Sequence, residues 1–340
     1  MTSYTSIVRD MLRPSPTASS PPWDPNTSMP LLTDRIVILT GPTSGIGYET
    51  LRQLILSSAH VYLFGRSLTR LEHTRDTIAA ECAAALAACP STSVRHGARP
   101  GRMSIVQCDL SDLHSIQRAA TEFLAKESRV DLVFGNAGVM VGGTTAQGYE
   151  MMFGTNVLGH HALLRLLLPA LQRSARTADT RVVLTASDTH RWVDRPAHLA
   201  LNADATNPAL GHIHLYGRSK LGNMYTTSHL AHLSSTHTWG LTVCAVHPGG
   251  VKSQLGSKNR LLTSLKNLFL VPATLGAVTQ LWGGTAAEGA LVHGGYLVPY
   301  AQVGSASELA RDEAVERDVW RWCEMQCVKH GLIGEGDVIE

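Results

Sequence analysis

Short runs rich in β-branched and aromatic residues alternate along this chain with longer segments that show the periodicity of helices. The runs are apolar at successive positions, which is typical of strands covered on both faces. The segments between them are long enough to form helices that connect parallel strands. The pattern therefore predicts an α/β fold with one doubly wound parallel sheet. The expected strands cover residues 35–40, 60–66, 103–109, 130–138, 181–187, 241–249 and 294–300.

Clusters of Pro, Gly and polar residues mark where this framework is extended or interrupted. Residues 1–30 are rich in Pro, Ser and Thr in their second half, so we expect a flexible lead-in to a single domain over residues 31–340. Breakers within residues 89–102 and 191–215 predict two inserted loops. A C-terminal helix is expected over residues 306–331.

Residues 254–285 form the most apolar segment outside the expected strands. Lys266, Asn267, Pro272 and Gln280 interrupt it, which favours a helix with one apolar face over a membrane span. Such a helix could close over a substrate, pack on the sheet or on a second copy of the chain, or contact a membrane surface. These alternatives stay open on the sequence, as does the choice between a monomer and a homodimer.

Composition narrows the classes of partner. The 340 residues are 44% hydrophobic and 16% charged, with a formal net charge of +2 and no basic block that would bind a nucleic-acid backbone. The N-terminus lacks the long apolar run of a signal peptide or an integral membrane span. The 6 cysteines include no CxxC pair, and the 16 histidines form no metal-binding motif. We expect a cytoplasmic protein with reduced thiols and no metal, acting on a small molecule.

A glycine-rich turn follows the first expected strand and leads into an expected helix: Thr40-Gly41-Pro42-Thr43-Ser44-Gly45-Ile46-Gly47. Glycines at such a turn let the backbone approach a pyrophosphate, and the amides and dipole of the helix N-terminus favour its negative charge. The spacing GxxxGxG differs from the GxGxxG form, and a tight turn without a ligand is the alternative. The position between strand and helix favours a dinucleotide-binding turn.

The end of the second expected strand bears on which dinucleotide binds. An acidic residue at this place would bind the 2′-hydroxyl of NAD, but the chain has Gly65 followed by Arg66. A guanidinium beside a small residue can bind a 2′-phosphate, so the sequence favours NADP over NAD. The alternative is an Arg66 that stacks on adenine or faces solvent.

Tyr216 and Lys220 are four residues apart, which places both side chains on one face of a helix. An ammonium near a phenol favours the ionised phenol and so tunes it for proton exchange. Alone, this spacing is also found on many solvated helices. Because it follows a dinucleotide-type turn, we interpret it as a proton donor for carbonyl chemistry.

Further short motifs follow one another in a fixed order. Asp109-Leu110 ends the third expected strand, Asn136-Ala137-Gly138 ends the fourth, and Ser187 ends the fifth. Between the last two, Asn156 stands in a helical segment, and the sixth strand leads into a Pro-Gly-rich segment. That segment reads Pro248-Gly249-Gly250-Val251-Lys252-Ser253.

Together these motifs resemble those of the short-chain dehydrogenase/reductase family over residues 32–300. The resemblance implies a Rossmann-type domain, NADP(H) as cofactor and the interconversion of carbonyl and alcohol groups. It implies a catalytic set of Asn156, Ser187, Tyr216 and Lys220. The cofactor-binding residues that it implies are Gly41, Ser44, Gly45, Ile46, Gly47, Arg66, Asp109, Leu110, Asn136, Ala137, Gly138, Tyr216, Lys220, Pro248, Gly249, Val251 and Ser253.

Some positions depart from the common family pattern. Strand five ends in Thr185-Ala186-Ser187 where many members have two serines, and Ser253 replaces the usual threonine. The gap from Ser187 to Tyr216 is longer than in compact members and is similar to that of the retinol-dehydrogenase-like branch. The segments around Tyr300 and Trp320 resemble fungal members. This branch implies a bulky apolar substrate.

The resemblance implies a role for each catalytic candidate. Tyr216 would donate a proton to the oxygen of a carbonyl as its carbon receives a hydride. Lys220 would hold the nicotinamide ribose and lower the pKa of Tyr216. Ser187 would position the carbonyl oxygen, and Asn156 would hold a water that links Lys220 to solvent, with a packing asparagine as the alternative.

The substrate pocket is expected between residues 191–215 and the segment after Ser253, with Trp320 or Trp322 folded back onto it. A second class of function stays open, an NADP(H)-binding protein that acts as a non-redox catalyst or a regulatory binder. The complete catalytic set favours the oxidoreductase, because a binder has no chemical need for all four side chains.

Overall fold

The computed structural model describes residues 23–194, 211–251, 271–287 and 290–340. Most of the expected lead-in, the middle of the expected loop over 191–215 and part of the apolar segment over 254–285 lie outside these ranges. Ser253 also lies outside the described residues.

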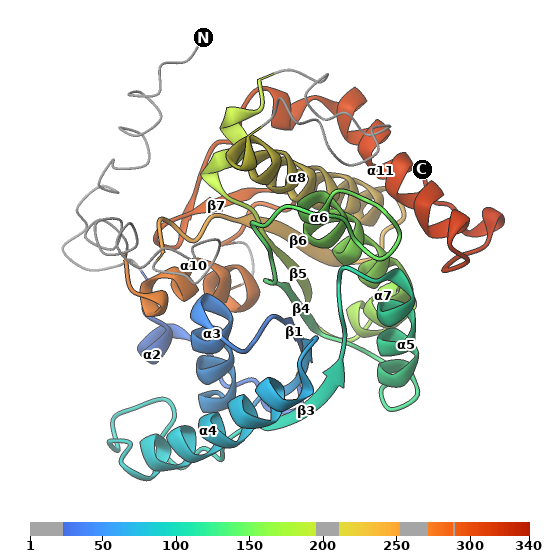
Figure 1. Ribbon diagram of the computed structural model, residues 1–340. Helices are drawn as coiled ribbons and strands as arrows, with labels where there is room; N and C mark the ends of the chain where they lie inside the picture. The colour runs from blue at the N-terminus through green and yellow to red at the C-terminus, as the bar shows by residue number, and fades with distance from the viewer. Residues whose placement is uncertain (1–22, 195–210, 252–270, 288–289) are drawn as a thin grey trace.

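The strands form one sheet in the order β3-β2-β1-β4-β5-β6-β7-β8 (Figure 1). Neighbours from β3 to β7 pair in parallel, and β8 pairs with β7 in antiparallel fashion. Each expected strand is present, and the doubly wound parallel sheet is confirmed. The strands are β1 (Ile36–Thr40), β2 (His60–Gly65), β3 (Arg102–Gln107), β4 (Leu132–Gly135), β5 (Thr180–Thr185), β6 (Leu241–Val246), β7 (Tyr296–Val298) and β8 (Gln302–Val303).

The ends of the strands differ from the expected ones, chiefly on one side. β4, β5 and β6 stop two or three residues early, because the chain leaves the sheet there to form the loops of the carboxyl edge. The sequence pattern did not predict β8, since two residues are too few to show alternation. A turn through Ala301, whose φ is 57°, returns the chain to pair with β7.

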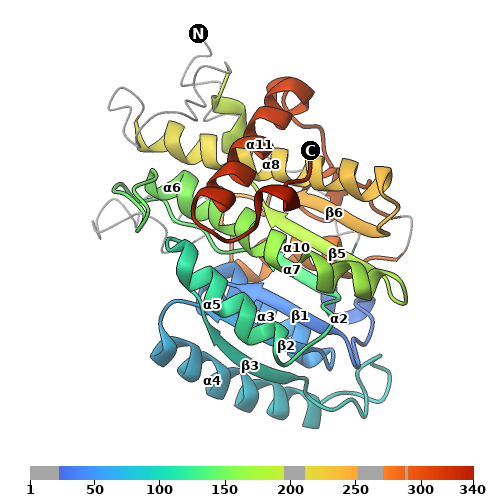
Figure 2. The ribbon, with the colours of Figure 1, turned by 90° about the vertical axis from the view of Figure 1, so that its right-hand side faces the viewer.

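Helices cover both faces of the sheet. Figures 1 and 2 show the sheet between the two layers. One layer contains α2 (Pro25–Ser28), α3 (Gly45–Leu56), α4 (Leu68–Ala87) and α10 (Ala273–Thr285). The other contains α5 (Leu113–Leu124), α7 (Gly159–Ala175) and α8 (His212–Thr236), with α11 (Glu313–Lys329) packed outside against α7 and α8.

Alternation along the strands builds two hydrophobic cores. Val37 and Leu39 of β1 face the layer of α3, whereas Ile36 and Ile38 face the layer of α5 and α7. Successive side chains of a strand point to opposite faces, so a strand that serves both cores has to be apolar throughout. This requirement is the physical origin of the continuous apolar runs in the sequence.

Within the described residues, the apolar segment over 254–285 forms the helix α10, which packs on the sheet. A Cβ on Gly276 of α10 would lie 2.6 Å from Val251 Cγ2, and one on Gly284 would lie 2.3 Å from Phe134 Cζ. The helix therefore approaches the sheet through its glycines. Across the ranges that the structure covers, no helix has the length and apolar character needed to span a membrane.

Short helical elements extend the framework. They are α6 (Met151–Phe153), a π-helix η1 (Gly154–Leu158), and the 3-10 helices η2 (Asp188–Trp192), η4 (Leu309–Arg311) and η5 (Glu335–Asp337). The expected loop over 191–215 thus begins within η2 and ends within α8. The 6 cysteines all fall within described residues and are free thiols.

Candidate active site

The sequence motifs converge at the carboxyl edge of the sheet. Thr40, Gly135, Thr185 and Val246 are the last residues of four adjacent parallel strands, β1, β4, β5 and β6. Open parallel sheets bind their ligands at this edge, where the strand order reverses around the first strand. The structure therefore brings the glycine turn, the 136–138 motif, Ser187 and the 248–251 segment to one side of the molecule.

The glycine turn has the shape of a cradle for a phosphate. Gly41 and Gly45 have φ values of 66° and 56°, which favour glycine, and a Cβ on Gly47 would lie 2.1 Å from the carbonyl oxygen of Gly41. Apart from its chain neighbours and the backbone of its own helix, no described atom lies within 4 Å of the place of a Cβ on Gly45, where α3 begins. Ser44 caps that helix without a side-chain hydrogen bond, so its hydroxyl does not compete with an anion for the first amides of the helix. These features fit a dinucleotide.

The 136–138 motif fastens this turn to β4. Asn136 Nδ2 donates to the carbonyl oxygens of Thr40 and Gly41, at 2.9 and 3.2 Å. A Cβ on Gly138 would lie 3.4 Å from Lys220 Nζ and 3.5 Å from Asn156 Oδ1. A larger residue at 138 would therefore press against two catalytic candidates.

Other cofactor candidates lie around the same edge. Asp109 Oδ1 accepts hydrogen bonds from the amide and hydroxyl of Ser111, which fixes the turn that follows β3. Gly249 has a φ of 87° after β6, and Val251 forms a bridge with Val271. The remaining candidates at this edge are the buried residues Leu110 and Pro248 and the half-buried Ile46 and Ala137.

Arg66 follows β2 directly, and its side chain is exposed. Its backbone is held in place because its carbonyl oxygen accepts from Gln107 Nε2 at 2.9 Å and that of Gly65 accepts from Cys108. Ser67 caps α4 immediately afterwards. The guanidinium is thus free to reach a ligand beside a rigid backbone.

Tyr216 and Lys220 share one face of α8, as the spacing predicted. Lys220 is 2% exposed, and its Nζ donates to the carbonyl oxygen of Thr185 at 2.7 Å. The same Nζ lies 5.5 Å from the centroid of the Tyr216 ring. The end of β5 therefore holds the ammonium beside the phenol.

Burial shifts the two pKa values in directions that the sequence did not predict. It raises the pKa of Tyr216 to about 12 and lowers the pKa of Lys220 to about 7. An amine that loses its proton near pH 7 carries no charge at the pH where such a phenol ionises. Among the groups of the chain itself, Lys220 therefore does not produce the expected lowering of the pKa of Tyr216.

Asn156 lies in the π-helix and ties two other elements together. Its Oδ1 accepts from the amide of Val139 at 2.8 Å, and its Nδ2 donates to the Val139 carbonyl and to Ser219 Oγ at 3.0 and 2.9 Å. The side chain thus clamps the loop after β4 to the residue beside Lys220. These contacts agree with the alternative of a packing asparagine.

Ser187 caps η2 two residues after the end of β5. Its Oγ accepts from the amide of Thr189 at 3.2 Å. A Cβ on Gly217 would lie 2.5 Å from the Thr189 carbonyl oxygen, so η2 packs against α8 next to Tyr216. Ser187, which caps η2, therefore lies near the first turns of α8, where Tyr216 is located.

Sequence reasoning missed a second donor to the carbonyl that holds Lys220. Asn223 Nδ2 donates to the Thr185 carbonyl oxygen at 3.0 Å. Its place three residues after Lys220, on the same helix face, was the available signal. Of the two tryptophans expected at the substrate pocket, Trp320 of α11 is buried and stacks on His229 of α8. Trp322 instead packs edge-on against Tyr149 and Phe153.

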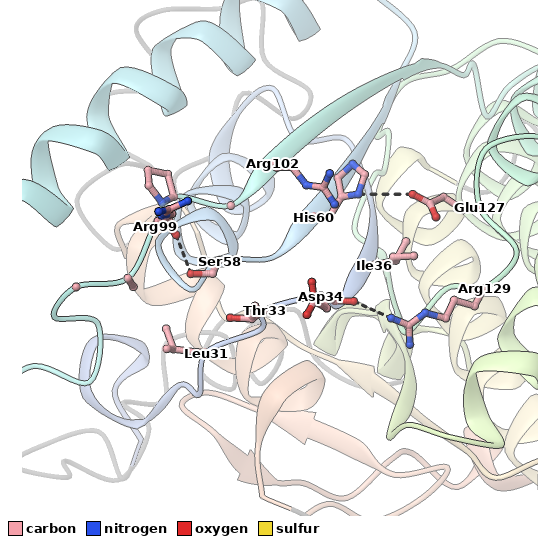
Figure 3. A pocket seen from close by; sticks show the side chains of 14 residues that line it. Leu31, Thr33, Asp34, Ile36, Ser58, His60, Arg99, Arg102, Glu127 and Arg129 are labelled. Atoms are coloured by element: carbon pink, nitrogen blue, oxygen red, sulfur yellow. Dashed lines mark hydrogen bonds and ion pairs between the residues drawn. The ribbon is translucent and has the colours of Figure 1, made fainter.

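A cavity of about 770 Å³ lies at the opposite edge, where β1, β2 and β3 begin (Figure 3). Among its lining residues, Arg129 donates to the backbone carbonyl oxygen of Asp34 at 2.8 Å, and His60 Nδ1 lies 3.6 Å from Glu127 Oε1. No buried side-chain nitrogen or oxygen of its lining residues, all of them described, lacks a hydrogen-bond partner. None of the proposed catalytic or cofactor-binding residues lines this cavity, so it is separate from the candidate active site.

Comparisons with known proteins identify the family. A family model described as short chain dehydrogenase matches residues 35–192. A short-chain dehydrogenase/reductase of Armillaria gallica is 33% identical over 335 residues, which cover 95% of this chain and 97% of that protein. The chain belongs to the short-chain dehydrogenase/reductase family. It is an oxidoreductase that acts on alcohol or carbonyl groups with a nicotinamide cofactor.

Two further matches refine this placement. Retinol dehydrogenase 12 of Homo sapiens is 35% identical over 256 residues, which cover 74% of this chain and 73% of that protein. The predicted retinol-dehydrogenase-like and fungal branch of the short-chain dehydrogenases/reductases is confirmed. A solved structure of an uncharacterized protein from Mycobacterium paratuberculosis superposes with a TM-score of 0.65 at 25% identity, covering 88% of this chain and 97% of that one.

Proposed function

We propose that this protein interconverts a carbonyl and an alcohol on a bulky apolar small molecule, with NADP(H) as cofactor and Tyr216 as general acid and base. The observation that carries the proposal is the Lys220 ammonium held by the Thr185 carbonyl beside the Tyr216 ring. This pair lies at the sheet edge that also carries the glycine turn. A proton donor and a dinucleotide cradle at one edge are the two parts that carbonyl reduction requires.

The cofactor would lie across the carboxyl edge. A bound nicotinamide supplies the hydride for reduction or accepts it for oxidation. Gly41, Gly45 and Gly47 would let the backbone approach the pyrophosphate at the N-terminus of α3. The exposed guanidinium of Arg66 would bind a 2′-phosphate. The other proposed contacts are Ser44, Ile46, Asp109, Leu110, Asn136, Ala137, Gly138, Tyr216, Lys220, Pro248, Gly249, Val251 and Ser253.

Tyr216 would handle the proton. With its pKa raised to about 12 by burial, the phenol is protonated at neutral pH and is ready to donate to a developing alkoxide. Lys220 would hold the nicotinamide ribose, and Ser187 would position the carbonyl oxygen. Asn156 would keep Lys220 in reach of a water by fixing the loop after β4 to α8.

An apolar approach to Tyr216 supports a bulky substrate. Val141 in the loop after β4 is 46% exposed, and Ile213 in the first turn of α8 is 37% exposed. A Cβ on Gly142 would lie 3.1 Å from His212 Cε1, so this loop and this turn face each other. His212 and Ile213 lie about one helical turn before Tyr216 on α8. Human retinol dehydrogenase 12, a relative, is named for an apolar alcohol.

The test is NADPH oxidation with carbonyls of different size. We expect all-trans-retinal and a bulky ketone to be reduced with a higher kcat/KM than acetaldehyde. Reduction of small aldehydes alone would contradict the substrate class. Tight NADPH binding without oxidation by any carbonyl of the panel would favour the non-redox binder.

A further inference from the structure

His160 is enclosed between the glycine turn and the π-helix. It is the second residue of α7 and is 1% exposed. Gly135, at the end of β4, makes room for its ring, since a Cβ there would lie 3.2 Å from His160 Cδ2. The proposed mechanism gives this imidazole no role, although both of its nitrogens contact parts of the site.

The partners of His160 define its tautomer. Nδ1 lies 2.9 Å from the carbonyl oxygen of Asn156, which can only accept, so Nδ1 carries the hydrogen. Burial lowers the pKa of His160 to about 4, so the ring is neutral at physiological pH and Nε2 is a bare acceptor. Nε2 lies 3.0 Å from Thr40 Oγ1, closer than the carbonyl oxygen of Phe134 at 3.3 Å, so we assign the single hydrogen of this hydroxyl to Nε2.

The Thr40 hydroxyl continues the chain of hydrogen bonds into the cofactor turn. Its oxygen accepts from the amide of Ala137 at 2.9 Å. A Cβ on Gly41, the next residue, would lie 3.0 Å from the Cα of Ala137, so this contact leaves little freedom. One directed path thus runs from the Ala137 amide through Thr40 and His160 to Asn156.

The other end of the path reaches the catalytic helix. In η1 the amide of Gly159 donates to Gly154, five residues back, as in a π-helix. Within this widened turn the imidazole of His160 bonds the Asn156 carbonyl. The side chain of Asn156 in turn donates to Ser219, the neighbour of Lys220.

We propose that His160 is a positioning residue, which holds the Thr40 hydroxyl and the Asn156 carbonyl at a fixed separation. It thereby joins the cofactor turn to the π-helix η1, whose Asn156 side chain bonds Ser219 next to Lys220. This inference rests on the proposed function for its catalytic consequence. The geometry of the four hydrogen-bonded groups does not depend on that function.

Two substitutions of His160 each keep one of the two hydrogen bonds of the imidazole and remove the other. In His160→Gln the longer amide reaches the place of Nε2 and can accept from Thr40, but no donor remains at the place of Nδ1. In His160→Asn the shorter amide can donate to the Asn156 carbonyl but cannot reach Thr40. Thr40→Val removes the hydroxyl, and Thr40→Ser keeps it as the matched control.

The first readout is NADPH affinity, measured by protein fluorescence without any substrate. We expect His160→Asn and Thr40→Val to raise the Kd about fivefold to tenfold, the factor of one ordinary hydrogen bond. His160→Gln and Thr40→Ser should stay within about twofold of the wild type. The double variant His160→Asn with Thr40→Val should bind NADPH no more weakly than Thr40→Val alone, because the valine already removes the hydroxyl from which His160 accepts.

The second readout is kcat for all-trans-retinal at saturating NADPH. Here the order reverses: His160→Gln should lose about fivefold to tenfold, and His160→Asn should stay near the wild type. A residue that merely fills space would change both readouts together in both variants. Equal effects of Gln and Asn, or an additive double variant, would overturn the inference.

A third measurement is independent of catalysis. Nitrogen-15 NMR of the histidine-labelled protein should show His160, assigned through its variants, as a neutral ring with the hydrogen on Nδ1. A hydrogen on Nε2 or a charged ring at neutral pH would refute the hydrogen-bond path. If the wild type bound no NADPH, the proposed function would fail, while this spectrum would still decide the tautomer.

Discussion

Burial determines the protonation of Lys220 more strongly than any charged neighbour does. Its pKa is about 7 in the folded chain against 10.5 for the free group. Between pH 7 and 10.5 the Lys220 amine binds a proton in the unfolded chain but not in the folded chain. The contribution of Lys220 to the free energy of unfolding therefore rises with pH in that range. Below pH 7 the cost of its burial is on the order of 5 kcal/mol.

Lys220→Met should therefore stabilise the protein at neutral pH while it abolishes turnover. The lost hydrogen bond to Thr185 offsets about 1.5–3 kcal/mol, which leaves a gain on the order of 2 kcal/mol at pH 7. The gain should shrink and then reverse towards pH 10. Urea unfolding at pH 6, 8 and 10 measures it, with the exposed Lys126→Met as control. A wild type that is more stable than the variant at every pH would contradict the lowered pKa of Lys220.

Tyr216→Phe removes only a hydroxyl and keeps the ring that packs beside Lys220. If the phenol is the general acid, turnover should fall by a factor on the order of 10² to 10⁴, with NADPH affinity nearly unchanged. Steady-state and single-turnover rates measure the loss, and Tyr62→Phe, at a remote tyrosine, is the control. Turnover within a few-fold of the wild type, with chemistry rate-limiting, would remove Tyr216 from this role.

Arg66 should determine the choice of cofactor. Each charge-assisted hydrogen bond to a 2′-phosphate is worth about 1.5–3 kcal/mol, and NAD offers only a hydroxyl there. We expect the wild type to use NADPH at least about tenfold better than NADH by kcat/KM. Arg66→Ala should narrow this gap by weakening NADPH alone, whereas Arg70→Ala, one turn into α4, should not. An undiminished preference in Arg66→Ala would show that another group reads the phosphate.

Residue types and spacing predicted which side chains gather at the site, but not their protonation. The glycine turn and the pair Tyr216 and Lys220 follow from local rules of spacing. The pKa directions depend on how completely α8 and β5 enclose the pair, which is a property of the packed fold. The contact of His160 with Thr40 likewise joins residues that are 120 positions apart, so no local pattern indicates it.

At the scale of elements, the sequence predicted the long regular strands but not the short or irregular elements. A strand buried on both faces has a run of apolar residues long enough to be recognised. The π-helix η1 and the two-residue strand β8 have no such signature, because contacts elsewhere in the fold determine them. In α10 the sequence shows no clear helical alternation of apolar and polar residues, because glycines face the sheet and the helix is apolar nearly all round.

Glu150 joins two elements near the candidate site. Its carboxylate accepts from the amides of Met152 and Phe153 at the start of α6. It also lies 3.0 Å from an Arg218 nitrogen, two residues after Tyr216. Both side chains are buried, so the pair and the helix cap depend on one carboxylate.

Glu150→Ala should cost about 3–5 kcal/mol, because it leaves a buried guanidinium without this partner and a helix without its cap. The matched control is Glu122→Ala, which removes an exposed pair with Lys126 and should cost less than about 0.5 kcal/mol. Urea unfolding at pH 7 compares the two variants. Equal small losses would mean that water or another group replaces the Glu150 carboxylate.

At the scale of the whole molecule, α11 returns from the end of the chain to cover the catalytic helix. Trp320, Cys323 and Cys327 bury one side of α11 against α7 and α8. Glu324 on this side accepts from His161 Nε2 at 2.7 Å and Arg165 Nε at 2.6 Å, and its other oxygen accepts from the amide of Ile339. One buried carboxylate thus links three segments that are distant in sequence.

Glu324→Gln should reveal this link through its dependence on pH. Burial alone would raise the pKa of Glu324, but the hydrogen bonds and charges of His161 and Arg165 outweigh it and lower that pKa. A carboxyl with a lowered pKa adds stability above its unfolded value near 4.5, and this stability is lost as the pH falls through the folded pKa. We expect Glu324→Gln to lose about 3 kcal/mol at pH 7 and the difference from the wild type to narrow below about pH 4.5.

Urea unfolding followed by tryptophan fluorescence suits this test, because Trp320 lies in α11 itself. Glu313→Gln is the control, since the Glu313 side chain is 84% exposed and lies 3.7 Å from Arg317 on the surface of the same helix. That variant should match the wild type at every pH, because screened surface pairs contribute little. A Glu324→Gln deficit that stayed constant down to pH 3 would mean that the Glu324 carboxyl has the same pKa in the folded and the unfolded protein. In that case His161 and Arg165 would not favour the ionised form of this carboxyl, and the link between α11 and α7 would not depend on pH in this range.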